Sequence, residues 1–272
     1  MPGADETIPS LELDRGPAAR GVAPVGNRAG RGLVFGAPAT RETQTSDDLK
    51  RAAAERAVTL IESGTVIGLG SGSTVRHLLE AIGRRLADGT LRDLTAVPTS
   101  DDTERRCRAL GIPLTTLDEH PCLKLAIDGA DEVGPRLDLI KGLGAALLRE
   151  KLVALAARRF IVIADASKRV RRLGTRAPVP VEVVPFGWST HLPFFRRLGA
   201  EPVLRLGADG APLVTDGGHY LVDCRFARGI PDPRALARAL AKRSGIVEDG
   251  LFLGIANAAV IAGERGVTVL RR

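Results

Sequence analysis

A glycine-rich loop and a set of acidic and basic residues provide the chemistry that this sequence could perform. The loop Gly68–Thr74 (GLGSGST) lies between a predicted strand and a predicted helix. Glycines let the backbone approach a phosphate closely, and a helix start adds free N–H groups. The candidate phosphate-binding residues are Ser71, Gly72, Ser73 and Thr74. The loop lacks the third glycine of a dinucleotide fingerprint and the lysine of a Walker loop. A tight turn with a serine cap is the alternative interpretation.

Two acids follow another predicted strand, in the segment Asp128-Gly129-Ala130-Asp131. Ligands of open α/β sheets collect at the carboxyl ends of the strands. The two carboxylates could therefore transfer protons or orient sugar hydroxyls. A metal site is less expected, because the segment has neither calcium-loop spacing nor a neighbouring histidine. An Asx turn with a helix cap explains the segment equally well.

A lysine and a glutamate are the next candidates. Lys141 begins the loop Gly142-Leu143-Gly144 and could reach a ligand anion, although an exposed loop lysine is equally compatible with the spacing. Glu150 lies in the following helix, beside an apolar face that we assign to Leu148, Leu152 and Leu155. From its neighbours alone, Glu150 is predicted to be a solvated surface residue.

Strands and helices alternate through the part of the chain that holds these residues. We predict strands at 65–69, 94–98, 123–127 and 160–164, and helices at 48–61, 75–87, 100–110 and 146–159. The first of these helices is expected to be capped by Ser46-Asp47-Asp48. Strands without polar alternation are typical of a sheet buried on both faces. The pattern predicts an α/β fold with a Rossmann-like parallel sheet covered by helices. Lys168 follows the fourth predicted strand and is therefore placed at the same sheet edge as the other candidates.

The remaining segments suggest three regions. Residues 1–45 are rich in glycine, proline, alanine and arginine without a period, and we predict a disordered extension. Residues 46–173 form the Rossmann-like domain, which we expect residues 246–272 to complete. Residues 174–245 show a β-α-β-β-α pattern with a hairpin turn at Gly217-Gly218, and predict a second, smaller α+β domain.

Composition excludes several classes of function. The 272 residues are 44% hydrophobic but contain no apolar stretch long enough to cross a membrane. The three cysteines are far apart, so neither a disulfide framework nor a cysteine zinc site is expected. The net charge is +7, but only 3% of residues are aromatic and they do not interleave with the basic ones, so no nucleic-acid partner is predicted. Without a recognisable secretory signal, we expect a cytoplasmic protein.

Together, the motifs resemble the type A ribose-5-phosphate isomerases. The matching segments, in family order, are GLGSGST, VPTS, GIPLTTLDE, LAIDGADEV, LIKGLGAALLREK, FIVIADASK, VPVEVVPF, VTDGGHYLVDC and GLFLGIA. The resemblance implies an enzyme of the non-oxidative pentose phosphate pathway that interconverts D-ribose 5-phosphate and D-ribulose 5-phosphate through an enediolate. It implies no cofactor and no metal, a sugar phosphate as the small-molecule partner, and a homodimer or homotetramer.

The resemblance also assigns roles to residues. It makes Glu150 the base that moves a proton between C2 and C1, with Lys141, Asp128 and Asp131 as the other catalytic residues. The substrate-binding positions are Ser71, Gly72, Ser73, Thr74, Gly129, Ala130, Gly142, Leu143, Gly144, Lys168 and, by a weaker match, Lys50.

Two positions depart from the family. Ser71 replaces a threonine and keeps the hydroxyl. Leu143 replaces a glycine, which would strain the loop if that residue needs a positive φ.

Two other functions compete with the isomerase. A sugar-phosphate sensor domain would keep the phosphate loop without turnover, but it would not need Glu150 and Lys141. A coenzyme A transferase would form an acyl-enzyme on Glu150 instead of exchanging a proton.

Overall fold

The computed structural model describes residues 45–272, which belong to one compact unit (Thr43–Arg272). The predicted extension, residues 1–45, lies outside the described residues except for Thr45. That residue, and not the predicted Ser46-Asp47-Asp48 segment, is the N-cap of the first helix, because its hydroxyl accepts a hydrogen bond from Asp48 N while the Asp48 carboxylate accepts one from Thr45 N.

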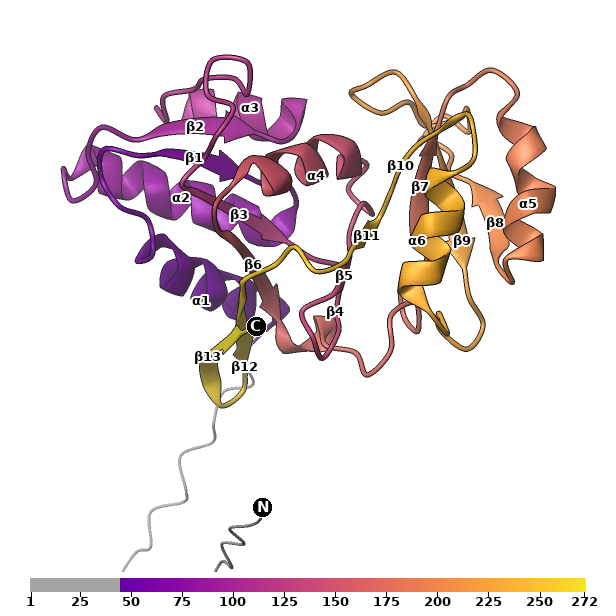
Figure 1. Ribbon diagram of the computed structural model, residues 1–272. Coiled ribbons are helices and arrows are strands. Elements are labelled where there is room, and N and C mark those ends of the chain that lie inside the picture. Colours follow the sequence, from indigo (N-terminus) through magenta and orange to yellow (C-terminus); the bar gives the residue numbers. More distant parts are fainter. Residues whose placement is uncertain (1–44) are drawn as a thin grey trace, which may run out of the picture. The chain divides into compact units, whose positions relative to one another are not determined.

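A six-stranded mixed sheet holds most of the predicted strands (Figure 1). Its strand order is β13-β12-β6-β3-β1-β2, and all neighbours are parallel except the hairpin β12–β13. The strands are β1 (Val66–Leu69), β2 (Thr95–Pro98), β3 (Leu125–Gly129), β6 (Phe160–Asp165), β12 (Ala258–Gly263) and β13 (Gly266–Arg271). The C-terminal segment therefore pairs with β6 from the far end of the chain. The predicted α/β class is confirmed, with one antiparallel edge strand.

Helices cover both faces of this sheet because successive strand residues point to opposite sides. Ile161 and Ile163 of β6 pack with one pair of helices, and Phe160 and Val162 pack on the opposite side with a third. The first pair is α1 (Ser46–Val58) and α2 (Ser73–Ala87), the helix opposite is α4 (Leu147–Ala156), and α3 (Asp101–Ala109) follows β2. Figure 1 shows α1 and α4 on opposite sides of β6.

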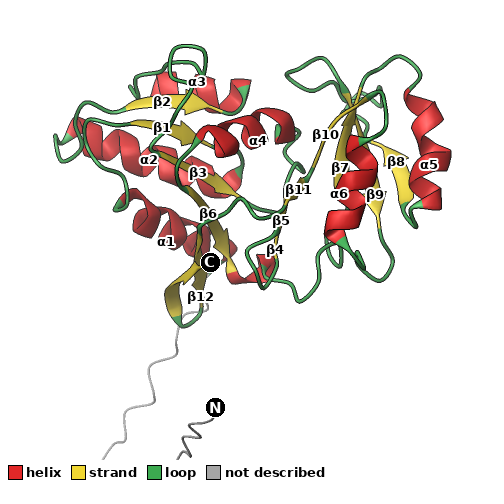
Figure 2. Ribbon diagram, in the orientation of Figure 1, coloured by secondary structure: helices red, strands yellow, loops and turns green. Residues whose placement is uncertain are grey.

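A second, antiparallel sheet has the order β10-β7-β9-β8 (Figure 2). Its strands are β7 (Val179–Val183), β8 (Glu201–Leu204), β9 (Tyr220–Arg225) and β10 (Ile246–Asp249). The helices α5 (Leu192–Arg197), which follows the short 3-10 helix η2 (Trp188–His191), and α6 (Pro233–Ala241) pack on one face of it. Gly217 and Gly218 lie in the turn before β9, whose two arms pair at Val214 and Tyr220 and are joined by a hydrogen bond from Thr215 N to His219 O at 2.8 Å.

A third, three-stranded sheet was not predicted from the sequence. It has the order β11-β5-β4, with β4 (Glu132–Val133), β5 (Leu139–Ile140) and β11 (Leu251–Phe252). These two-residue strands are too short to show a period. The sheet begins directly after Asp131 and β5 ends directly before Lys141, so it fixes the positions of both residues. Lys141 N donates to Gly250 O at 2.9 Å, and Asp131 N to Ile140 O at 2.8 Å.

No helix within residues 45–272 is long and apolar enough to cross a membrane. The three cysteines are free thiols.

Candidate active site

A buried lysine between two buried carboxylates forms the centre of the site. Lys141 Nζ lies 2.9 Å from Asp128 Oδ2 and 3.2 Å from Glu150 Oε2, and it donates a hydrogen bond to Gly129 O at 2.7 Å. All three side chains are at most 5% exposed. Asp128 comes from the end of β3, Lys141 follows β5 and Glu150 lies in the first turns of α4. The structure thus brings together three of the four predicted catalytic side chains in direct contact.

Burial and mutual repulsion set the protonation of this cluster. Removal from water, and then the nearby Asp128 charge, raise the pKa of Glu150 from 4.5 to about 8. Burial also raises the pKa of Asp128, against the lowering effect of Lys141. For Lys141, burial acts to lower the pKa, but the two carboxylates outweigh it and raise the pKa above its ordinary value. The lysine therefore stays charged, and Glu150 can gain or lose a proton near neutral pH.

Two carboxylate oxygens of this cluster have ion-pair contacts but no directed hydrogen bond. They are Asp128 Oδ2 and Glu150 Oε2, both fully enclosed by the described residues. Asp128 Oδ1, in contrast, accepts hydrogen bonds from Ser71 N at 3.0 Å and Gly129 N at 2.6 Å. Buried polar atoms without partners are uncommon in folded proteins, and they often mark a site where a ligand completes the hydrogen bonding.

The burial of Glu150 corrects the orientation that we predicted for its helix. The buried residues of α4 are Leu147, Glu150, Lys151, Val153 and Ala154. Leu152 and Leu155, which the sequence assigned to the apolar face, are 51% and 63% exposed. The reason is that both charged residues of this face have partners of opposite charge, Lys141 of the active site for Glu150, and Glu248 and Asp249 of β10 for Lys151. Hydrophobic periodicity does not detect such pairing.

Asp131 and the loop after Lys141 lie beside the central cluster. Asp131 Oδ2 accepts a hydrogen bond from Leu143 N at 3.0 Å. Gly142 has φ +103°, and a Cβ there would lie 2.8 Å from the Leu147 side chain. Leu143 is not among the residues with positive φ, whereas Ala145 is, at +64°. The strain expected at Leu143 is therefore absent, and the non-glycine residue of the loop with a positive φ is Ala145.

The glycine-rich loop leads from β1 into α2 as predicted. Gly70 must be glycine, because a Cβ there would lie 1.9 Å from Asp128 Oδ1. Gly72 is the N-cap of α2 with φ +99° and provides no side-chain cap. The first N–H groups of a helix have no partner within it, so those of Ser73 and Thr74 are suited to an anion.

The Ser71 hydroxyl lies in a cluster of hydroxyl groups. It is within 2.9 Å of Thr99 Oγ1, 2.7 Å of Ser100 Oγ and 3.1 Å of Thr103 Oγ1. Thr103 Oγ1 donates in turn to Gly70 O at 2.8 Å. Sequence reasoning assigned no role to these three partners individually, although VPTS contains two of them. The cluster supports the shape of the loop, because it ties the loop to the end of β2 and the start of α3.

Lys50 and Lys168 form no hydrogen bond or ion pair with the central cluster among the described residues. Both side chains are half-buried, Lys50 in the first turns of α1 and Lys168 at the end of η1 (Ala166–Lys168) after β6. His77 Nε2 lies 3.0 Å from Asp47 Oδ1, which places the start of α1 against the first turns of α2. Among residues 45–272, no hydrogen bond or ion pair joins Lys50 or Lys168 to another predicted site residue.

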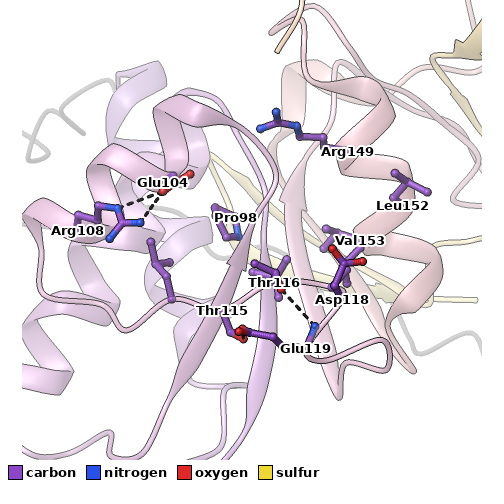
Figure 3. A pocket seen from close by; sticks show the side chains of 13 residues that line it. Pro98, Glu104, Arg108, Thr115, Thr116, Asp118, Glu119, Arg149, Leu152 and Val153 are labelled. Atoms are coloured by element: carbon purple, nitrogen blue, oxygen red, sulfur yellow. Dashed lines mark hydrogen bonds and ion pairs between the residues drawn. The ribbon is translucent and has the colours of Figure 1, made fainter. Parts of the chain in front are cut away.

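A cavity of about 580 Å³ lies between α4 and the part of the chain formed by β2, α3 and residues 114–119 (Figure 3). Arg149, Leu152 and Val153 line one wall, and residues of β2, α3 and the segment 114–119 line the other. Asp128, Lys141 and Glu150 are not among its lining residues. Of the groups that line it, Arg108 is paired with Glu104 and Thr115 with Glu119. Within residues 45–272, no group of three histidine, cysteine or acidic side chains is arranged to hold a metal ion.

Comparison with known proteins identifies relatives along most of the chain. Residues 95–266 match the family described as ribose 5-phosphate isomerase A (phosphoriboisomerase A). The sequence is 56% identical over 221 residues to a ribose-5-phosphate isomerase A of Roseiflexus castenholzii, covering 81% of this chain and 94% of that protein. It is 47% identical over 245 residues to the probable chloroplastic ribose-5-phosphate isomerase 3 of Arabidopsis thaliana, covering 88% of this chain and 89% of the plant protein.

Solved structures give the same result. A D-ribose-5-phosphate isomerase in complex with phospho-erythronic acid superposes with a TM-score of 0.82 at 37% identity, covering 84% of this chain and 100% of the other. The ribose 5-phosphate isomerase of Plasmodium falciparum gives 0.80 at 39% identity, covering 83% and 99%.

Proposed function

This chain belongs to the ribose 5-phosphate isomerase A family and is an aldose–ketose isomerase, and we propose that Glu150 moves the proton between C2 and C1 of the sugar phosphate. It interconverts D-ribose 5-phosphate and D-ribulose 5-phosphate in the pentose phosphate pathway. The observation that supports the role of Glu150 is its position: a buried carboxylate with one oxygen free of directed hydrogen bonds, 3.2 Å from a charged lysine.

The proposed reaction follows from these groups. Glu150 takes the proton from C2 of the open-chain aldose, the C1–C2 double bond forms, and negative charge develops on O1. Lys141 stabilises that charge, and such preorganised electrostatic stabilisation is worth about 10²–10³ in rate. The protonated Glu150 then delivers the proton to C1 while the O2 proton passes to O1, so that O2 becomes the carbonyl oxygen and O1 the hydroxyl. One carboxylate serves both steps because the proton moves only to the neighbouring carbon.

The raised pKa of Glu150 suits this role. A carboxylate with an ordinary pKa is a weak base, whereas one near 8 has a larger driving force to accept a proton from carbon. Asp128 and Asp131 shuttle hydroxyl protons when the sugar ring opens. The solved relative with phospho-erythronic acid supports this arrangement, since a carboxylate with two oxygens on one carbon imitates the charge of the enediolate.

The phosphate is proposed to bind at the start of α2, with Ser73 and Thr74 as donors and Lys50 and Lys168 at the rim. Binding energy from the phosphate helps to position the reacting end of the substrate. Gly129, Ala130 and Gly142–Gly144 line the reacting end, and the Ser71 hydroxyl shapes the loop. We further propose that the reaction needs no metal ion, because Lys141 supplies the cation. A homodimer or homotetramer in the cytoplasm is also proposed.

The test compares wild type with Glu150→Gln and Glu248→Gln in the presence of EDTA, by following conversion of ribose 5-phosphate. Glu248 is the matched control, because it also pairs with a lysine of α4, Lys151, but lies outside the central cluster. Glu150→Gln should fold and lose about 10²–10⁴ in kcat. Glu248→Gln should keep most of the activity.

Deuterium uptake at C2 in heavy water gives a second readout of proton transfer. Full activity or full deuterium exchange in folded Glu150→Gln would show that another group is the base. Loss of wild-type activity with EDTA would refute metal independence. Tight binding of ribose 5-phosphate without turnover by wild type would instead favour a sensor.

A further inference from the structure

An arginine from the region of the four-stranded antiparallel sheet reaches the loop that follows Lys141. This sheet, with the helices α5 and α6 that pack on it, is called the smaller sheet region. Arg205 comes directly after β8, and its side chain is 13% exposed. Its Nη1 donates to Gly142 O at 2.9 Å and to Leu143 O at 3.1 Å. Its Nε donates to Asp223 Oδ2 at 2.9 Å, and Nη2 contacts Asp223 Oδ1. A planar guanidinium held on both sides in this way has little freedom to turn.

This contact fixes the direction of two successive peptide groups. In a trans peptide the N–H points opposite to the C=O, and the described chain has no cis peptide bond. With the carbonyls of Gly142 and Leu143 turned toward Arg205, the N–H groups of Leu143 and Gly144 turn to the opposite side. The Leu143 N–H confirms this direction, because it donates to Asp131 Oδ2 at 3.0 Å.

That opposite side is the side of the proposed chemistry. Asp131 lies close to the central cluster, because its N donates to Ile140 O at 2.8 Å, next to Lys141, and Lys141 Nζ donates to Gly129 O, two residues before Asp131, at 2.7 Å. Gly142 O also accepts a hydrogen bond from Ala145 N at 3.1 Å, which closes the loop into a turn. The positive guanidinium polarises both peptides and makes their N–H groups stronger donors.

We infer that Arg205 is a positioning residue of the isomerase: by holding the carbonyls of Gly142 and Leu143, it aims the following N–H groups at Asp131 and the reacting end of the substrate. Asp223 keeps the guanidinium in place. This inference rests on the proposed role of the Lys141 cluster. Its consequence is that part of the electrostatic stabilisation of the enediolate depends on the smaller sheet region.

The experiment measures kcat, KM and inhibitor binding for Arg205→Met, Arg205→Lys and Asp223→Asn. Phospho-erythronic acid is the probe for the reacting end, and inorganic phosphate is the probe for the phosphate site. Arg243→Met is the matched control, because Arg243 also bonds to a backbone carbonyl, Thr190 O at 2.7 Å, but within the smaller sheet region. Each variant is measured at a temperature well below its melting midpoint.

Misplacing reacting groups by about 1 Å costs on the order of 10²-fold, so Arg205→Met should lose about 10–100-fold in kcat with a smaller change in KM. Its affinity for phospho-erythronic acid should fall, while its affinity for phosphate stays unchanged. Arg205→Lys should recover part of the loss, because one ammonium can still reach a carbonyl. Asp223→Asn should lose less than Arg205→Met, and Arg243→Met should keep wild-type kcat.

The inference is overturned if folded Arg205→Met keeps wild-type kcat, or if it loses phosphate and phospho-erythronic acid binding equally. If Arg205→Met does not fold, Arg205→Lys and Asp223→Asn decide by the same two probes. Glu150→Gln is measured in parallel. Full activity of Glu150→Gln refutes the proposed base, whereas an inactive Glu150→Gln with a fully active Arg205→Met refutes only the inference about Arg205.

Discussion

Two buried lysines contact the same aromatic ring, but the hydrogen bonding around them differs. The difference distinguishes a lysine proposed to act in the reaction from one that stabilises the fold. Lys141 Nζ lies 5.5 Å from the centroid of the Phe252 ring, and Lys151 Nζ lies 5.0 Å from it. Each lysine has two acidic neighbours, Asp128 and Glu150 for Lys141, and Glu248 and Asp249 for Lys151. The two clusters therefore contain almost the same kinds of side chain.

The hydrogen bonding of the two clusters is different. Lys151 Nζ donates to Glu248 Oε1 and to Asp249 O, both at 2.7 Å. The same Glu248 oxygen accepts Asp249 N at 2.8 Å, and Asp249 Oδ1 accepts Leu251 N at 2.9 Å. Around Lys141, one oxygen of Asp128 and one of Glu150 are left without a directed bond. A network in which every group is hydrogen-bonded resists change, whereas enclosed oxygens whose one partner is the Lys141 ammonium can change protonation when the charge beside that lysine changes.

Of the changes that test the comparison of the two lysines, Lys141→Met should have the largest effect. The change removes the cation beside the developing negative charge, so kcat should fall by about 10²–10³. It also leaves two buried carboxylates unpaired, which should lower the free energy of unfolding by about 3–5 kcal/mol. Activity assays and urea unfolding measure the two effects. A folded Lys141→Met with wild-type kcat would break the comparison, because the two lysines would then be equivalent.

Lys151→Met should affect stability more than chemistry. The lysine holds α4 to β10, and its loss leaves the Asp249 carboxylate without its cationic partner, so unfolding should become easier by about 3 kcal/mol. The kcat of the folded fraction should fall much less than in Lys141→Met. Urea unfolding followed by assays at low temperature checks this. Equal losses of kcat in the two lysine variants would show that the second cluster also takes part in the chemistry.

The raised pKa of Glu150 predicts a pH dependence of stability. Between 4.5 and about 8 the folded protein retains a proton that the unfolded chain has released, so the unfolding free energy should fall as pH rises through this window. The slope from one such group is at most about 1.4 kcal/mol per pH unit. Denaturant unfolding of wild type and Glu150→Gln across this range should show the extra slope in wild type only. Parallel curves would mean that the Glu150 pKa is close to 4.5.

The smallest effect concerns the backbone of the loop. Ala145 has φ +64°, so Ala145→Gly should relieve left-handed strain and raise the unfolding free energy by up to about 1 kcal/mol. The matched control is Ala146→Gly, because Ala146 has φ −116° and should only lose stability. Thermal melts compare the two variants. A loss of stability in Ala145→Gly equal to that in Ala146→Gly would show that the loop stores no strain there.

Several features of the fold and the site could be predicted from the sequence because they depend on local patterns. Runs of apolar residues predicted the strands β1, β2, β3 and β6. The glycines between β1 and α2 predicted the tight loop there, because glycine permits a close turn of the backbone. The order of the motifs along the chain indicated the family, and the family indicated which residues are candidates for the site. The burial of Glu150 was predicted wrongly from its neighbours, because its partner Lys141 lies nine positions away on another element.

The sequence by itself determined two things: which reactive groups are present, and the alternation of strands and helices that places them at one edge of a sheet. Both depend only on residue types and on the short-range spacing of apolar residues. Only the tertiary structure decided how those groups meet. It created the three-stranded sheet that holds Asp131 and Lys141, it turned α4 so that Glu150 and Lys151 face inward, and it brought Arg205 onto the loop of Gly142. The physical reason is that ion pairs and hydrogen bonds between distant segments depend on distance in space, which no local pattern encodes.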